Sequence, residues 1–341
     1  MKFHGQNPYP YEIDVPDPTI DSFTLSLCTP CEQAFVNGCN DLIQGHEDHA
    51  LASFKTAAKA HKEFFDAWFM VALLELKRGR VDIARQAFLR IVGSEEPFYG
   101  FHILRFMPRF RPMLNFYEDF TFHAMPTTSA VAAALARMYL IEGKVREAKK
   151  VIHPAFREYP DDFAVCVVWA QSMLESESPD EIIDEIDMKM SLHSGRNEIE
   201  LVLTFLIGQA YLMKDDFRSA ISHLESVLHH GQGKNPRLMD FFRINIAKVY
   251  EKEGYLTDAF EAVDEVEDQF LPYDDSMTVE LKRYWLINRM ETFRTQGIIK
   301  PIEFNFTYRD RRAQRDCGYL EFKRPDAKDN PDKNRTKKIH D

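Results

Sequence analysis

The segment from Ser129 to Pro160 constrains the fold most, because it predicts two helices joined by a tight turn at Gly143. Small side chains recur in it, as at Ala136 and Ala148, with larger apolar side chains between them. Two helices approach closely only where a side chain is small, and bulky neighbours fill the remaining space. The closing proline ends the second helix. The segment is therefore typical of a helical hairpin that packs against another hairpin.

The alanine that opens the second helix of this hairpin recurs along the chain. The candidates are Ala50, Ala84, Ala148, Ala220 and Ala259. The first two lie 34 residues apart, and the next interval is 64 residues, close to two such periods. A regular recurrence of one hairpin predicts an array in which each unit packs on its neighbours.

This pattern resembles the tetratricopeptide repeat, a helix–turn–helix unit of about 34 residues. In the second unit, Trp68, Ala72, Gly79 and Phe88 stand at the positions that the motif requires. The resemblance covers about residues 31–271, or to residue 296 with a final cap helix. It implies an all-α solenoid of about six helical hairpins, with a C-terminal cap helix.

The two ends of the chain differ from the repeats in composition and residue pattern. Residues 1–24 hold four prolines, which disfavour helix, and predict an extended aromatic arm. Residues 25–296 make the predicted solenoid. Alternating apolar and polar residues over 297–324 predict a short β-hairpin, and the charged residues 325–341 predict a disordered tail.

Two units of the predicted solenoid depart from the motif. Residues 95–128 are rich in Phe and interrupted by prolines, although Leu114 and Tyr117 keep a rough helical spacing. We expect a distorted helical hairpin there, and a protruding aromatic contact surface is the alternative. Residues 162–193 begin with a well-formed first helix, but no glycine marks the following turn. A kink or irregular stacking is expected at both units.

Charge and composition narrow the classes of function. The net charge is −11, and residues 305–341 carry 11 Lys or Arg against 7 Asp or Glu, so the rest of the chain carries −15. An acidic body of this kind disfavours nucleic-acid binding. The five cysteines have no disulfide-framework spacing, which favours a reducing compartment. With no signal peptide and no apolar run long enough to span a bilayer, we expect a cytoplasmic protein without membrane insertion.

The resemblance also implies a concave groove, lined by the first helix of each hairpin, that binds peptide segments of other proteins. Carried onto this chain by register, the groove positions are Phe35, Cys39, Phe69, Leu73, Ala133, Arg137, Val167, Gln171, Phe205, Gln209, Ile244 and Lys248. Relatives that clamp a C-terminal carboxylate need Lys, Asn and Arg at these positions, and the first two units lack them. The apolar start of the groove favours an amphipathic or extended hydrophobic ligand. The alternative is that the Phe side chains pack on adjacent hairpins.

A conceivable metal set lies near the start of the first hairpin. Cys28 and Cys31 have the spacing of metal ligands, and His46 and His49 are the nearest histidine pair. A structural zinc site needs four ligands, and no second cysteine pair is present. Ordinary surface and packing roles explain these residues better. The chain also lacks Gly-rich phosphate loops and nucleophile motifs, so we predict no metal, cofactor or catalytic site.

The function predicted is a non-enzymatic scaffold or adaptor that binds a peptide segment or a folded protein within a larger complex. Two alternatives stay open. The chain is an escort that holds an apolar segment of a client protein, or it is a regulatory module of an enzyme. The arm over residues 1–24 is a candidate occupant of the groove.

Overall fold

The structure is a computed structural model of the 341-residue chain. It describes residues 26, 28–93, 111–187 and 197–255, together with 258–259, 261–262 and 266. The chain divides into two compact units, residues 1–232 and residues 233–341, and each is described by itself. The predicted arm over 1–24, the cap helix, the β-hairpin over 297–324 and the tail over 325–341 lie outside the described residues.

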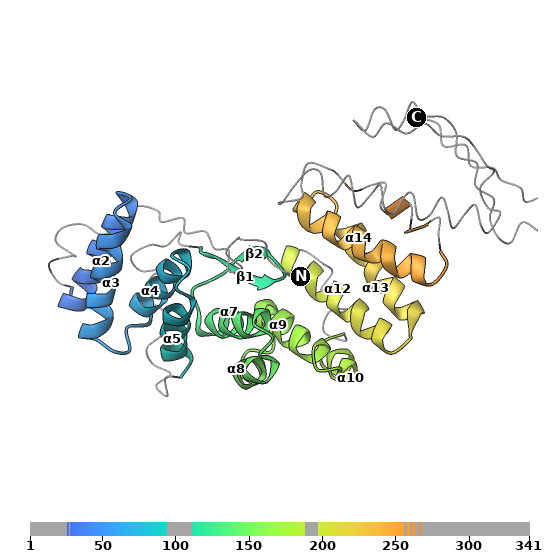
Figure 1. Cartoon of the computed structure of the whole chain (residues 1–341), viewed down its shortest axis with the longest axis horizontal. Helices are drawn as coiled ribbons and strands as arrows, with labels where there is room; N and C mark the ends of the chain where they lie inside the picture. The colour runs from blue at the N-terminus through green and yellow to red at the C-terminus, as the bar shows by residue number, and fades with distance from the viewer. Residues whose placement is uncertain are drawn as a thin grey trace, which may run out of the picture. The chain divides into compact units, whose positions relative to one another are not determined.

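The first unit contains four complete antiparallel helical hairpins in its described part (Figure 1). The helix pairs are α2 (Pro30–Ile43) with α3 (Glu47–Ala60), α4 (Phe65–Lys77) with α5 (Val81–Val92), α7 (Thr128–Ile141) with α8 (Val145–Glu158), and α12 (Glu198–Met213) with α13 (Phe217–His230). In the last three pairs the first helix (α4, α7 or α12) is apolar nearly all round, and the second is amphipathic with an exposed polar face, whereas α2 also carries polar residues on its outer side. The predicted helical hairpins are therefore confirmed in these four places.

The turns between paired helices share one backbone geometry. Gly45, Gly79 and Gly143 have φ between +70° and +78°, the left-handed region that costs glycine least. In the α12–α13 turn, Asp215 takes this place with φ +58°. The N–H of the third residue after the helix end bonds back to the carbonyl five residues earlier, for example His46 to Asp41 at 2.8 Å. This bond closes the first helix and reverses the chain.

Small residues decide how closely the paired helices approach. The marker alanines of the four hairpins, Ala50, Ala84, Ala148 and Ala220, are completely buried. A Cβ atom added at Gly38 would lie 2.7 Å from Cε1 of Phe54, which is closer than any real contact. The ring therefore occupies the space that the missing side chain leaves.

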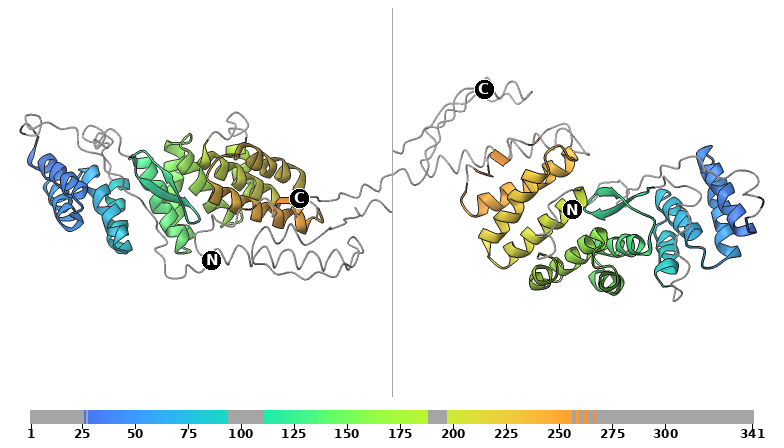
Figure 2. Two further views of the ribbon diagram at one scale, coloured as in Figure 1. Left: turned by 90° about the horizontal axis from the view of Figure 1, so that it is seen from above. Right: turned by 180° about the vertical axis from the view of Figure 1, so that it is seen from behind.

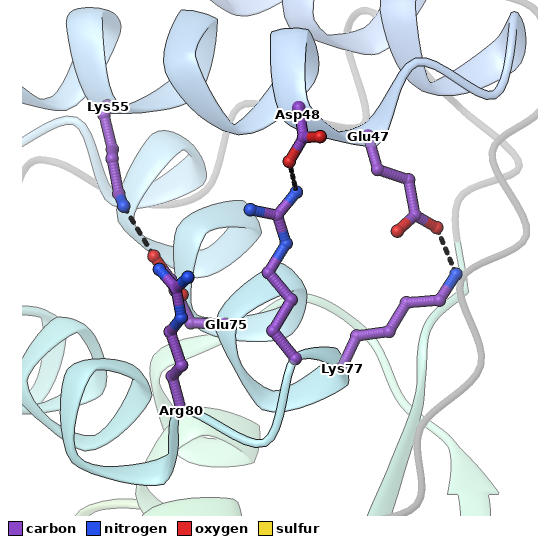
Figure 3. Close-up of polar contacts among 7 residues, drawn as sticks. Glu47, Asp48, Lys55, Glu75, Lys77 and Arg80 are labelled. Atoms are coloured by element: carbon purple, nitrogen blue, oxygen red, sulfur yellow. Dashed lines mark hydrogen bonds and ion pairs between the residues drawn. The ribbon is translucent and has the colours of Figure 1, made fainter.

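Ion pairs join the first two hairpins across the α3–α4 interface (Figure 3). Lys55 Nζ lies 2.5 Å from Oε1 of Glu75, whose side chain is completely buried. Arg78 Nη2 lies 2.6 Å from Oδ1 of Asp48, and Lys77 pairs with Glu47. The last two pairs join the start of α3 to the end of α4, so both carboxylates at the start of α3 have a cationic partner.

Residues 111–128 do not form the helical hairpin that the spacing of Leu114 and Tyr117 predicts. They form an antiparallel β-hairpin of β1 (Met113–Tyr117) and β2 (Phe120–His123), with Met113 opposite His123. Apolar and polar residues alternate along β2, and in β1 the polar Asn115 lies between Leu114 and Phe116, so a period of two prevails over the helical spacing. Their aromatic side chains are buried, so they do not make a protruding contact surface. The rest of the predicted unit, residues 95–110, lies outside the described residues.

The unit predicted over 162–193 is irregular, as its sequence indicates. Its first helix is α9 (Phe163–Leu174), which is followed by a short α10 (Pro179–Ile182) and a π-helical turn η1 (Ile183–Asp187). The buried side chains of Ile182 and Ile186 anchor this short segment, and both α10 and η1 contact α12. Residues 188–196 lie outside the described part of the chain.

The second unit begins with α14 (Pro236–Lys252). Gly254, with φ +83°, makes the same kind of turn as in the first unit, and Ala259 is completely buried beyond it. A fifth hairpin thus begins where the recurrence predicts it. Across all described residues, none of the helices has both the length and the apolar character that a bilayer-spanning helix needs.

Candidate functional site

Seven of the predicted groove residues are core residues instead. They are at most 1% exposed: Phe35, Cys39, Phe69, Leu73, Ala133, Val167 and Phe205. The ring of Phe35 lies 5.3 Å from the rings of both Phe54 and Phe64, and the ring of Phe69 lies 6.3 Å from that of Phe88. The prediction that these side chains line an open groove is therefore wrong, and the alternative that they pack on neighbouring helices is right for both rings. Residues that line a groove and residues that pack on a neighbouring helix recur with the same helical spacing, so the spacing alone does not distinguish the two faces.

Two polar groove positions do come together, and they hold the β-hairpin. Arg137 on α7 donates from Nη1 to Oε1 of Gln171 on α9 at 2.7 Å, from Nε to Oδ1 of Asn115 on β1 at 3.2 Å, and from Nη2 to the carbonyl of Glu118 at 3.1 Å. Gln171 Nε2 donates to the carbonyl of Phe116 at 2.6 Å. Three elements distant in the sequence meet at one buried network.

The β-hairpin lies against the first helices of two successive hairpin units. β1 contacts both α7 and α9, and Figures 1 and 2 show the two strands beside these helices. Asn115 completes the network from within the hairpin, donating from Nδ2 to the carbonyls of Glu118 at 2.9 Å and Phe120 at 3.0 Å. The helix face that the family resemblance assigns to peptide binding is thus occupied by a strand of the same chain. We call Asn115, Arg137 and Gln171 the hairpin seat.

The hairpin seat buries the charged guanidinium of Arg137, and removing this charge from water costs free energy. Arg137 is only 9% exposed, and burial lowers its pKa from the usual value, while the nearby Glu118 carboxylate opposes that shift. Burial also raises the pKa of the neighbouring Tyr117 well above its ordinary range. A charge held this way needs every donor satisfied, and the seat supplies an acceptor to three guanidinium nitrogens. The arrangement recognises backbone and amide oxygens and contains no nucleophile or general base.

The remaining groove predictions do not join this seat. Gln209 is half-buried on α12, while Ile244 and Lys248 lie on α14 in the second unit. Sequence reasoning missed Asn115, because it treated the surrounding segment as helix. The alternation of apolar residues around it was the signal that could have found it.

A second polar cluster joins η1 to the last hairpin of the first unit. His223 Nε2 lies 2.7 Å from Oδ1 of Asp187, and the Tyr211 hydroxyl donates to the same carboxylate. The other ring nitrogen, Nδ1, lies 2.9 Å from the carbonyl of Ser219. Because both imidazole nitrogens already face oxygen atoms, the ring has no lone pair directed at a substrate. The cluster fixes η1 in place.

The conceivable metal set is only half assembled. Donor atoms of His46 and His49 come within 4.8 Å of each other and of a carboxylate oxygen of Asp41, which the sequence did not suggest. Neither Cys28 nor Cys31 belongs to this cluster. Cys39, the third cysteine of that region, is buried, and burial raises the pKa of its thiol far above the usual value.

Comparisons with known proteins agree with the hairpin geometry. Residues 42–97 match the tetratricopeptide repeat family. No curated protein sequence matches the chain. The described helices, their left-handed turns and their buried marker alanines define an α-helical hairpin repeat protein. Within that class, the match over residues 42–97 identifies tetratricopeptide repeats in this part of the chain.

Several solved structures are similar to it. One is the Cut9–Hcn1 heterotetramer of the APC/C, at 14% identity over 75% of this chain, with a TM-score of 0.48. The match spans 42% of that chain, less than half of its length. Another is pilF of Pseudomonas aeruginosa, at 13% identity over 76% of this chain and 97% of that one, with a TM-score of 0.46. The N-terminal domain of the EccA1 ATPase from the ESX-1 secretion system of Mycobacterium tuberculosis is similar at 14% identity over 74% and 88%, with a TM-score of 0.47. Likeness at this level carries no function from one protein to another.

Proposed function

We propose that this protein is a non-enzymatic scaffold that binds an extended segment of a partner protein on the inner face of α7 and α9. The tetratricopeptide repeat fold serves protein–protein interaction in general. The observation that carries the proposal is the hairpin seat, where Gln171 donates to a main-chain carbonyl of β1 and Arg137 donates to the carbonyl of Glu118 in the turn that follows it. Side chains that bind backbone oxygens accept an extended segment with little dependence on its sequence.

The β-hairpin is then the resident occupant, and a partner strand takes its place. The hairpin has only two strands, and such a unit is marginal in water unless it packs on a larger body. Its own stability therefore depends on the same two helices that the partner would use. A partner that supplies equal carbonyl acceptors and a longer apolar strand competes for them.

The escort alternative loses its main support. It rests on a row of Phe side chains in an open groove, and Phe35, Phe69 and Phe205 are buried in the core. A regulatory role through the tail depends on residues outside the described part. The cytoplasmic location stays part of the proposal, supported by four described cysteines that form no disulfide.

A synthetic peptide of residues 111–124 tests the exchange directly. Asn115→Ala removes the hairpin's contribution to the seat but leaves Arg137 and Gln171 in place, so we expect this variant to bind the labelled wild-type peptide. The wild-type protein should bind it at least tenfold more weakly, because its own hairpin competes. Fluorescence anisotropy measures both affinities, with circular dichroism as the control for folding.

Gln171→Leu tests the contribution of the helices to peptide binding. Added to Asn115→Ala, it removes the donor to the strand carbonyl, and the double variant should lose peptide binding. Affinity purification followed by mass spectrometry should then recover more partner with Asn115→Ala and less with Gln171→Leu. Equal recovery with both variants would mean that partners bind another face.

A further inference from the structure

We propose that Asp41, His46 and His49 form a binding site for a divalent transition-metal ion, with zinc as the natural occupant. One carboxylate oxygen and two imidazole nitrogens lie within 4.8 Å of one another. Asp41 stands in the last turn of α2, and the two histidines stand at the start of α3. A metal ion bound there would join the two helices of the first hairpin.

The backbone of the turn places the three residues together. Gly45 has φ +78°, and the N–H of His46 donates to the carbonyl of Asp41 at 2.8 Å. His49 follows one helical turn later, and residues spaced by three share a helix face. The two imidazole rings lie 5.9 Å apart. The proximity therefore follows from a hydrogen-bonded turn, although the side chains themselves are partly or largely exposed.

The same turn elsewhere in the chain carries other side chains. In the second hairpin, Arg80 N–H donates to the Glu75 carbonyl at 2.8 Å, the equivalent of the His46–Asp41 bond. There the carboxylate pairs with Arg80 at 3.6 Å and Lys55 at 2.5 Å, and the third position is Ile83. Three ligand-type side chains thus meet only at the first turn among the described hairpins, so the cluster is not a by-product of the repeat.

The charges around the cluster leave it able to accept a cation. Glu47 and Asp48 lie between the two histidines in the sequence, and each already pairs with a cation, Lys77 and Arg78. Asp41 makes one weak contact, a 3.4 Å hydrogen bond from Ser53. Among the described residues, neither imidazole has a hydrogen-bond partner. The C-terminus of α2 attracts a cation and the N-terminus of α3 repels one, so the two helix ends nearly cancel.

The donor set selects the kind of metal. Two imidazole nitrogens and one carboxylate oxygen suit zinc, which takes four ligands in a tetrahedral arrangement and bonds nitrogen and oxygen at about 2.0–2.2 Å. Tetrahedral geometry then puts the donors about 3.4 Å apart, so donor atoms that lie up to 4.8 Å apart need to converge by up to about 1.4 Å. Both histidines are exposed and can rotate to do so. The fourth position is left for water or for a side chain of a bound protein.

Calorimetric titration of the full-length protein with zinc chloride tests the site. We expect one ion bound per chain, and at least tenfold weaker binding after His46→Ala, His49→Ala or Asp41→Asn. Alanine at position 46 does not remove a helix cap, because the His46 side chain makes no capping hydrogen bond. His229→Ala combined with His230→Ala is the matched control, since these adjacent rings lie 4.9 Å apart outside any such cluster.

Cobalt provides a second readout that identifies the ligand atoms. Cobalt bound at this site should give a visible spectrum of tetrahedral nitrogen and oxygen ligation, without a thiolate charge-transfer band. The proposal is overturned if no ion binds at one per chain, if the His229–His230 control lowers affinity as much as His46→Ala, or if a thiolate band appears and disappears with Cys28→Ser.

Discussion

Replacing Arg137 with methionine should loosen the β-hairpin from α7 and α9. The guanidinium makes three hydrogen bonds in the hairpin seat, and methionine fills a similar volume without donors. Oε1 of Gln171 and Oδ1 of Asn115 lose their guanidinium donor in a site that stays buried. The Glu118 carbonyl keeps a donor from Asn115, so it is not left unpaired.

The magnitude follows from these two orphaned acceptors. A buried acceptor without a partner costs about 1–3 kcal/mol, so two cost about 4 kcal/mol. Methionine carries no charge, so the variant avoids the free energy that desolvating the guanidinium costs in the wild type. This gain offsets part of the loss from the two unpaired acceptors. We expect a net loss of about 2 kcal/mol in the free energy that holds the hairpin closed, which corresponds to about thirtyfold faster amide exchange.

Hydrogen exchange of residues 113–123 is the assay, because unfolding of a repeat array is not a single two-state step. Arg146→Met is the matched control, since that arginine is exposed on α8 and should change stability by less than about 0.5 kcal/mol. Combining Arg137→Met with Gln171→Leu should give a coupling energy of at least about 0.5 kcal/mol. Wild-type exchange rates in Arg137→Met would refute the anchoring role of the guanidinium.

Three further outcomes follow from other parts of the structure. Gly38→Ala should destabilise the first hairpin by about 1–3 kcal/mol, measured by amide exchange of α2 and α3, because its new Cβ would lie 2.7 Å from the Phe54 ring. Glu75→Gln should lower the thermal midpoint by weakening the 2.5 Å pair with Lys55, at about 1–2 kcal/mol, and an unchanged midpoint would contradict the importance of that pair. Burial raises the pKa of Tyr211 from 10 to about 12, so its neutral phenol stabilises the fold below pH 10, and this stabilisation is lost as pH rises through 12. The ultraviolet difference titration between wild type and Tyr211→Phe should show that late ionisation.

The hairpins could be predicted because their signals are local. A glycine at three of the four turns and an alanine five residues later are enough to place Gly45 and Ala50, or Gly143 and Ala148, in the structure. The left-handed turn needs glycine or its equivalent, and the close helix contact needs a small side chain. Each requirement restricts the residue type at a fixed position of the hairpin, so the sequence alone reveals it.

The hairpin seat could not be predicted in the same way. Leu114 and Tyr117 fit a helical spacing, while Leu114 and Phe116 fit a strand spacing, so the segment alone is ambiguous. The strand pairs with its partner on a surface supplied by Arg137 and Gln171, which lie 20 to 60 residues further along. The choice depends on contacts that no local pattern encodes.

The cluster of Asp41, His46 and His49 could not be predicted for a related reason. His46 and His49 are visible as a pair, but Asp41 joins them only through the backbone bond of the turn. The same bond recurs at every complete hairpin of the first unit, so a search for ligand-type residues at its two ends would have found Asp41.

The most direct measurement is hydrogen exchange of residues 113–123 in the protein alone and in its complex with a partner recovered by affinity purification. Exchange of the partner strand for the resident hairpin predicts that these amides lose protection in the complex, while the amides of α7 and α9 keep theirs. Unchanged protection of residues 113–123 in a saturated complex would contradict the proposal that partners bind at the hairpin seat.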